Sequence, residues 1–131
     1  MEIYIIYYFI WVSVISFFLF LFYNIFFSFL FFTLGKEIWS NGSFFEGVYE
    51  EGKKNGKGRL EWADGSSCYG DFVDNKIHGC AIYTWKDKRV YKGEWRNNKM
   101  NGQGEFTWPD GRIFQGYYKD DKKEGYGIFE W

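Results

Sequence analysis

The sequence predicts a mainly β protein, an elongated single-layer antiparallel meander of β-hairpins preceded by one hydrophobic helical segment. Three observations predict this fold class. Residues 3–34 carry no charge, the remainder repeats with a strict period of 23 residues, and apolar and polar side chains alternate within each period. All 16 glycines follow residue 34. We therefore divide the 131 residues into a hydrophobic segment, 1–34, and a repeat array, 35–131.

The hydrophobic segment is long enough to cross a bilayer, because about 20 apolar residues in a helix suffice and this run has 32. Aromatic and β-branched residues surround every face of such a helix, so it has no polar side to meet water. We expect an uncleaved, single-pass transmembrane anchor. Glu2 is the only charge before the segment, whereas Lys36 and further basic residues follow it, which places the repeat array on the cytoplasmic side.

Two other interpretations of residues 1–34 remain open. The segment could fold back as a hydrophobic helix onto the sheet. It could also be a gene-model artefact, because its bias toward Phe, Ile, Leu and Tyr resembles translated, unspliced T-rich DNA. In that second case we expect the protein to be cytoplasmic.

The repeat array consists of a half repeat at 35–44, repeats at 45–67, 68–90 and 91–113, and a partial repeat at 114–131. Glycine holds the third and twelfth positions of every unit, an aromatic residue the fifth, and tryptophan the eighteenth. In the third unit Tyr91, Gly93 and Trp95 alternate with Lys92 and Glu94, and this period of two indicates strands. Each unit therefore contains two strands, and the half repeat adds one, which makes nine.

Turn residues separate the predicted strands. Those that tolerate a left-handed backbone occupy the eighth position of each unit: Gly52, Asn75, Asn98 and Asp121. The links between units carry Asn41-Gly42, Asp64-Gly65 and Asp110-Gly111, with Asp87-Lys88 as a weaker exception. These signals predict hairpins throughout.

The small and large residues of the pattern share one face of the sheet, so that glycine leaves a gap in which a neighbouring ring can lie. Cys68 and Ala81 depart from this pattern in the second unit. No sequence remains to build a covering layer, so we expect this aromatic face to be partly exposed, or shielded by something else, and to bind a partner. Some of its rings could instead cover themselves through curvature of the sheet. The candidate binding residues are Tyr49, Trp62, Phe72, Trp85, Trp95, Trp108, Tyr118 and Trp131.

The spacing seen in Tyr91-Lys-Gly-Glu-Trp95, Gly102-Gln-Gly104 and Trp108-Pro-Asp-Gly111 resembles the MORN (membrane occupation and recognition nexus) repeat. The resemblance covers nearly all of 35–131. It implies a curved single-layer sheet that serves as a scaffold, a protein-binding surface or a membrane-proximal tether, sometimes credited with binding acidic phospholipids. Such repeats also occur as non-catalytic modules of lipid kinases, protein methyltransferases and junctional membrane proteins.

Charge and chemistry exclude several functions. In the repeat array 16 basic residues balance 16 acidic ones, so no net field attracts nucleic acid. The chain has one histidine, its two cysteines are not spaced for zinc, and it has no nucleophile motif or phosphate loop. We therefore expect no enzyme activity, cofactor, metal or small-molecule substrate.

The ninth position of each unit is lysine, which predicts a row of ammonium groups along one edge: Lys53, Lys76, Lys99 and Lys122. Such a row suits phosphoinositide headgroups, although acidic residues at the seventh position cancel much of its charge. We predict a non-catalytic, membrane-associated scaffold that binds protein. The alternatives are a phosphoinositide-binding or acidic-lipid-binding module and a regulatory repeat fragment of a larger enzyme such as a lipid kinase.

The two ends of the predicted sheet offer a second binding mode. The strands near residues 37–41 and 125–131 each leave backbone N–H and C=O groups unpaired on one side. We expect self-association or pairing with a strand from a protein partner at these edges.

Overall fold

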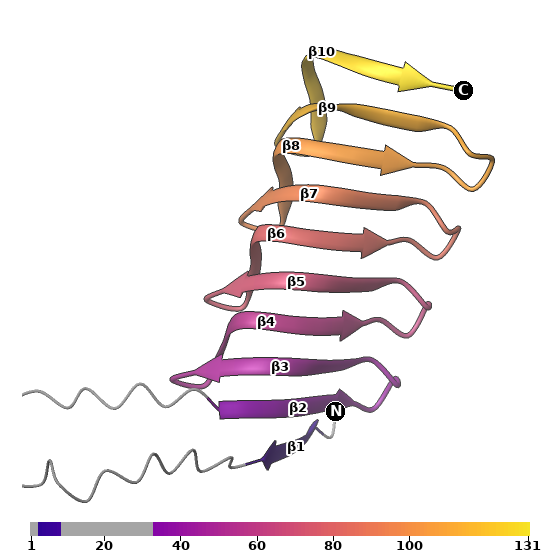
Figure 1. Cartoon of the computed structure of the whole chain (residues 1–131). Coiled ribbons are helices and arrows are strands. Elements are labelled where there is room, and N and C mark those ends of the chain that lie inside the picture. The colour runs from indigo at the N-terminus through magenta and orange to yellow at the C-terminus, as the bar shows by residue number, and fades with distance from the viewer. Residues whose placement is uncertain (1–2, 9–32) are drawn as a thin grey trace, which may run out of the picture.

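A computed structural model describes residues 3–8 and 33–131 of the chain. These residues form one antiparallel sheet in which each strand pairs with its neighbours in chain order (Figure 1). The strands are β1 (Ile3–Tyr8), β2 (Thr33–Trp39), β3 (Phe44–Glu50), β4 (Lys53–Glu61), β5 (Ser67–Val73), β6 (Lys76–Thr84), β7 (Val90–Arg96), β8 (Lys99–Thr107), β9 (Ile113–Lys119) and β10 (Lys122–Glu130).

The predicted meander is confirmed. The nine strands β2–β10 correspond to the half repeat and to the two strands of each following unit, and the described residues contain no helix. Strand β2 begins at Thr33, two residues before the predicted start of the array. The described array therefore consists of a single layer of strands (Figure 1).

Residues 3–8 are a strand where we expected the start of a helix. Strand β1 pairs with β2 in a continuous register from Ile3↔Trp39 to Tyr8↔Leu34. Isoleucine and tyrosine favour strands, and the free edge of β2 supplies backbone partners that a helix would not use. Residues 9–32, on which the anchor and its alternatives chiefly depend, lie outside the described residues. Within the described part, no helix has the length and apolarity to span a membrane.

The pairing of β1 corrects the prediction of an open edge near residues 37–41. The outward side of β2 is hydrogen-bonded to β1, so it is not free to recruit another strand. At the other end, β10 pairs only with β9 among the described strands.

The hairpin turns inside the repeats have two residues with positive φ. In the first unit Glu51 and Gly52 have φ of 49° and 76°, and Asn97 and Asn98 in the third unit have 48° and 66°. Positive φ at both central residues defines the type I′ turn, whose twist matches that of antiparallel strands. The eighth position thus has the left-handed conformation that the sequence predicts.

The links between repeats form a second kind of turn. The N–H of Gly65 donates to the carbonyl of Trp62 at 3.0 Å, and the side chain of Asp64 accepts from the N–H of Ser66 at 2.8 Å. The same turn forms at Asp87-Lys88, where Lys88 adopts a φ of 70° without being glycine. The weak dipeptide therefore gives the same turn with a less suitable residue.

A bulge recurs in each even-numbered strand of the repeats. Between β7 and β8 the register passes from Gly93↔Gly104 to Trp95↔Met100, so β8 uses extra residues there. Gly102 lies in this stretch with a φ of 110°, which explains why glycine holds the twelfth position. The even-numbered strands bend sharply near these bulges (Figure 1). The bends curl the sheet toward one face, which we call the inner face.

Candidate functional site

The inner face is built on pairs of glycines that lie beneath an aromatic ring. A Cβ atom at Gly47 would come within 2.8 Å of the Phe45 ring and 2.5 Å of the Cα atom of Gly58 on the neighbouring strand. Tyr91 covers Gly93 and Gly104 in the same way, and Phe114 covers Gly116 and Gly127. The predicted alternation of small and large residues is thus present, with the ring of the first repeat position in the gap.

These first-position rings connect successive repeats. Phe45 meets Tyr49 of its own unit and Phe72 of the next with ring centroids 5.4 and 5.0 Å apart, both edge to face. Tyr91 contacts Trp95 and Tyr118 similarly, at 5.5 and 5.1 Å. Edge-to-face pairs of this kind each contribute about 0.5–1.5 kcal/mol beyond the burial of their area.

This packing decides between the alternatives that the sequence leaves open for the fifth-position aromatics, which are covered and not exposed. Tyr49, Phe72, Trp95 and Tyr118 are between 2% and 8% exposed, because neighbouring rings and the curl of the sheet cover them. They form part of the hydrophobic core of the array.

The second repeat replaces the first-position ring with Cys68, and the third repeat compensates. Cys68 is fully buried. In the first and third units the first-position ring packs against the fifth-position ring of the next unit. At the corresponding place in the third unit lies Trp95, the largest of the fifth-position residues. The indole N–H of Trp95 donates to the carbonyl of Ala81 at 3.3 Å. A larger side chain thus fills space that the smaller Cys68 leaves.

A second row of aromatic rings on the inner face is less buried, except for Phe106, which is 8% exposed. Its successive centroids are 4.6–5.7 Å apart, from Trp62 on the turn after β4 to Trp131 after β10. We call this the ring row: Trp62, Tyr83, Trp85, Phe106, Trp108, Phe129 and Trp131. Four of the eight predicted binding residues belong to it, and of these Trp62, Trp85 and Trp108 are half-buried and Trp131 is 91% exposed.

A groove of about 610 Å³ lies beside the first part of the ring row. Aromatic rings and aliphatic side chains form its walls, and amides, hydroxyls and one ammonium group are among its polar groups. The lining residues are Trp39, Asn41, Ser43, Lys54, Leu60, Trp62, Phe72, Asn75, Ile77, Tyr83, Trp95 and Asn98. We refer to this space and the ring row together as the inner groove.

The ammonium group of the groove lies in an aromatic cradle and is neutralised there. Lys54 Nζ lies 5.3 Å from the Trp39 ring centroid and 5.1 Å from that of Phe45. It bonds to Glu37 Oε2 at 2.9 Å, and the hydroxyl of Tyr49 donates to the same oxygen at 3.1 Å. The Lys54 and Glu37 side chains are only 15% and 17% exposed, so this pair is shielded from solvent.

Arginines cover two tryptophans of the ring row at the turns. Arg112 lies 5.3 Å over the Trp108 ring, and its Nε bonds to Asp110 Oδ2 at 2.8 Å. Arg89 repeats this arrangement over Trp85 with Asp87. The hydrogen bonds from the arginines lower the pKa of Asp87 and Asp110 below the ordinary value for aspartate. Asp87 and Asp110 are therefore each paired with an arginine of the same turn.

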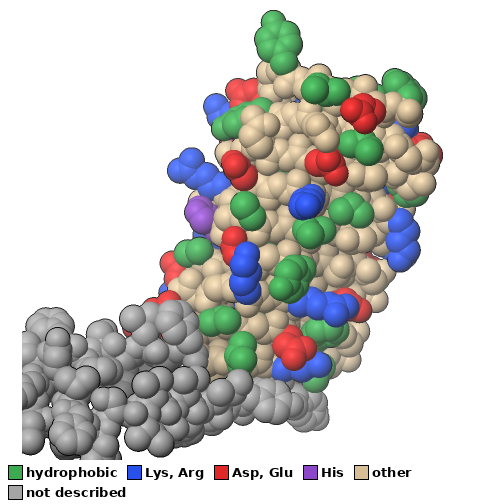
Figure 2. Space-filling view, viewed as in Figure 1, with side chains coloured by type: hydrophobic (Ala, Val, Ile, Leu, Met, Phe, Trp, Pro, Cys, Tyr) green, Lys and Arg blue, Asp and Glu red, His purple; other side chains and the backbone are tan. Residues whose placement is uncertain are grey.

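The predicted lysine row lies at the hairpin edge, where each lysine begins an even-numbered strand. Lys53, Lys76, Lys99 and Lys122 are all exposed. The acidic turn residues Glu51, Asp74 and Asp120 lie close to them in the chain. On the visible face of the array, basic side chains are interspersed with acidic ones (Figure 2).

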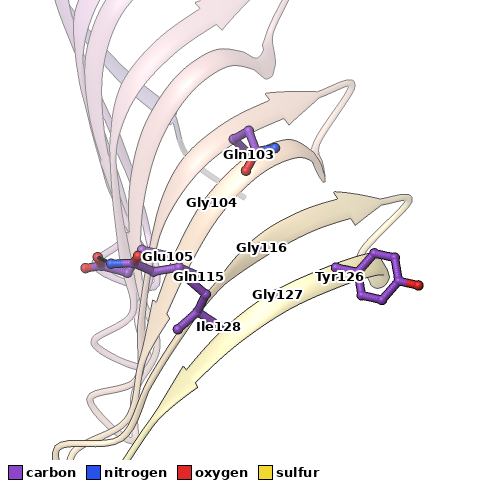
Figure 3. A pocket seen from close by; sticks show the side chains of 8 residues that line it. All are labelled: Gln103, Gly104, Glu105, Gln115, Gly116, Tyr126, Gly127 and Ile128. Carbon is purple, nitrogen blue, oxygen red and sulfur yellow. Dashed lines mark hydrogen bonds between the residues drawn. The ribbon is translucent and has the colours of Figure 1, made fainter.

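The opposite, outer face has an open hollow of about 570 Å³ near the C-terminal strands. The glycines 104, 116 and 127 form its floor, and the side chains of Glu105 and Gln115 join across two strands by a 2.8 Å hydrogen bond (Figure 3). Tyr126 and Ile128 project from β10 at its rim. Glu105 is its only titratable group besides the fully exposed Tyr126, so the hollow brings no acid and base together.

The buried titratable groups of the inner face are held in their neutral forms. Burial raises the pKa of the Cys68 thiol and that of the Tyr118 hydroxyl each to about 12. In residues 3–8 and 33–131, no three His, Cys, Asp or Glu side chains are grouped to hold a metal ion. The inner groove thus presents rings, amides and cations that are mostly paired with carboxylates, an arrangement that suits binding.

Sequence reasoning missed Glu37 as a site residue. It placed Lys54 beside the lysine row and the asparagines in turns, and did not predict that these residues line the groove. Asn98 was assigned only a turn conformation, yet its side chain also bonds to the preceding repeat. Comparison of Glu37 with the sixteenth position of later units, where Leu60, Tyr83 and Phe106 lie, would have marked it as an acid on an aromatic face.

The geometry defines a class of protein, a single-layer β-hairpin repeat array with a ring-lined inner face. The sequence pattern of the MORN repeat matches residues 45–67, 68–88, 91–111 and 114–131. The chain therefore belongs to the MORN repeat family, whose repeat is a non-catalytic module, and the suspected resemblance is confirmed. Comparison of the chain with curated proteins gives no match.

Proposed function

We propose that this protein is a non-catalytic MORN repeat scaffold that binds a segment of a protein partner in its inner groove. The observation that supports the proposal is the ring row, which continues without a gap over seven rings while its tryptophans keep exposed surface. Half-buried tryptophans beside a groove are the residues that most often dominate the energy of binding.

The dimensions favour an extended peptide segment. From the Trp62 end of the row to the Trp131 end, the sheet advances six strands, from β4 to β10. At about 4.8 Å per strand this is about 29 Å, which an extended chain covers with about nine residues. The groove amides of Asn75 and Asn98 supply polar atoms beside the rings.

The test begins with a displayed library of random peptides selected on the immobilised full chain. Binders are then measured against Trp85→Leu and Trp108→Leu, with Tyr69→Leu and Tyr117→Leu on the outer face as matched controls. We expect the first pair to lose at least about tenfold in affinity and the controls to lose less than about threefold. Equal losses in both pairs, with all variants folded, would refute binding in the groove.

Membrane association and edge pairing remain parts of the proposal that other experiments address. Anchoring through residues 1–34 predicts that the full chain stays with membranes at high salt and alkaline pH, and that deletion of these residues releases it. Pairing through the outer side of β10 predicts self-association that Ile128→Pro reduces, because proline removes one backbone donor. Binding of acidic lipid by the lysine row predicts that charge reversal at those lysines abolishes liposome binding.

A further inference from the structure

The two ends of the inner face carry copies of the same lysine cradle. A shift of 69 residues, three repeats of 23, relates Lys54 to Lys123, Phe45 to Phe114 and Trp39 to Trp108. Lys123 Nζ lies 3.9 Å from the Phe114 centroid and 5.2 Å from that of Trp108. These rings correspond to the ones that surround Lys54.

The two cradles differ in their acid. In the first, Glu37 accepts bonds from both Lys54 and Tyr49. The same shift relates Glu37 to Phe106, so the second cradle has an aromatic ring in place of the carboxylate. Among the described residues Lys123 has no ion pair, although its ammonium lies over three rings.

A second group in the second cradle also lacks its partner. Tyr118 corresponds to Tyr49 and faces Lys123 across strands β9 and β10, as Tyr49 faces Lys54 across β3 and β4. Tyr118 is 2% exposed, and its hydroxyl has no hydrogen-bond partner in the described structure. A buried hydroxyl without a partner is uncommon and costs stability. Both groups that hold the carboxylate in the first cradle are thus unpartnered in the second.

We propose that the cradle of Lys123 binds an acidic side chain of the protein segment that occupies the inner groove. This rests on the proposed function and adds a chemical preference to it, a Glu or Asp that follows apolar residues along the ring row. Of these cations, Lys123 is the one left to attract a carboxylate, because Lys54 is neutralised by Glu37 and Arg112 is paired with Asp110. Movement of the Phe106 ring would bring the same carboxylate to the Tyr118 hydroxyl.

The ring row identifies the source of the carboxylate as a peptide. Phe129 and Trp131 continue the row past Lys123 and are 39% and 91% exposed, so apolar side chains can lie on both sides of the acid. Lys123 is exposed, so its ammonium over the rings is open to a carboxylate, which it can bind through a short, charge-assisted hydrogen bond.

The experiment uses the library-selected peptides and the full chain. We expect selection to enrich Asp or Glu at one position, and replacement of that residue by Asn or Gln to weaken binding about tenfold. In Lys123→Gln the acidic and amide peptides should bind equally, whereas Lys92→Gln, at an exposed lysine of the outer face, should leave the difference intact. Phe106→Glu supplies a carboxylate from within, so it should abolish the preference for the acidic peptide.

The outcomes separate this inference from the proposed function. Groove-dependent binders without any acidic preference, or a preference that survives Lys123→Gln, would overturn the carboxylate site and leave the groove. A library that yields no groove-dependent binders would refute both the carboxylate site and the proposed function. The last measurement is the binding of the full chain and of Lys123→Gln to vesicles containing phosphatidylserine. If Lys123→Gln weakens binding to vesicles and not to the acidic peptide, the anion is a lipid headgroup and the peptide assignment is wrong.

Discussion

The side-chain oxygen of Asn98 accepts a hydrogen bond from the backbone N–H of Ile77 at 2.8 Å, and the backbone N–H of Asn98 donates to the Ile77 carbonyl at 2.9 Å. The turn of one repeat is thereby joined to the first residues of the preceding repeat's even strand. Asn75 and Asp121 make the same pair of bonds to Lys54 and Met100. We call this pair of bonds the repeat clasp.

The clasp predicts a side-chain effect separate from turn conformation. Asn98→Gly keeps the positive φ but removes the acceptor for the Ile77 N–H, so we expect a loss of about 1 kcal/mol in the free energy of unfolding. Asn98→Asp keeps the acceptor, as Asp121 does, and should lose less. Urea unfolding of the two variants measures the difference. Equal midpoints would show that only the turn conformation matters.

The turn at Lys88 predicts a stabilising change. Lys88 has a φ of 70°, and the corresponding residues of the other turns are glycines with φ of 88–93°. Lys88→Gly removes the steric cost of a left-handed side chain, partly offset by the greater freedom of glycine when unfolded. We expect a gain of about 0.5–1 kcal/mol in urea unfolding, and Lys86→Gly, outside the strained position, to give no gain.

The unpartnered hydroxyl of Tyr118 predicts opposite effects at two tyrosines. Tyr118→Phe removes a buried polar atom without a partner, so the variant should be more stable by about 1 kcal/mol. Tyr91→Phe removes a hydroxyl that donates to the Glu94 carbonyl at 3.1 Å and should be less stable by a similar amount. Thermal unfolding compares them. A loss of stability in both would show that Tyr118 has a partner in solution.

The two faces of the sheet differ in their tolerance of bulk. A side chain at Gly93 would come within 2.6 Å of the backbone of Gly104, whereas Glu94 is exposed on the outer face. Gly93→Val should cost about 2–3 kcal/mol and Glu94→Val less than about 1 kcal/mol. Matching urea midpoints would contradict the assigned faces.

The raised pKa values predict a loss of stability at alkaline pH. Cys68 and Tyr118 have folded-state pKa values of about 12, above their unfolded values of about 8.5 and 10. Groups with a raised acid pKa contribute stability below the unfolded pKa, and this contribution falls as pH rises toward the folded pKa. Unfolding free energy should therefore fall from about pH 8.5 upward. The unfolding free energy of Cys68→Ala should fall less between pH 8 and 10 than that of the parent chain. A parallel decline in the two proteins would exclude the thiol as a cause.

The repeat pattern predicted nearly all of the described fold, because the period, the alternation and the turn dipeptides are local signals. The sequence left open whether Tyr49 and Phe72 are exposed or covered by curvature of the sheet, because their burial depends on the curl that the bulges at the twelfth position impose. The same limit applies to the site. Trp62, Trp85, Trp108 and Trp131 were identified as surface aromatics, but the pairing of Glu37 with Lys54 joins residues 17 positions apart on non-adjacent strands.

Binding in the inner groove is tested most directly by the indole N–H signals of the tryptophans in proton–nitrogen correlation spectra. The full chain, labelled at tryptophan, is titrated with a library-selected peptide. We expect the indole signals of Trp62, Trp85 and Trp108 to shift in proportion to occupancy, and that of Trp95, which is bonded to the Ala81 carbonyl beneath the surface, to move least. Saturable peptide binding that leaves the signals of Trp62, Trp85 and Trp108 unchanged would contradict the groove as the binding site.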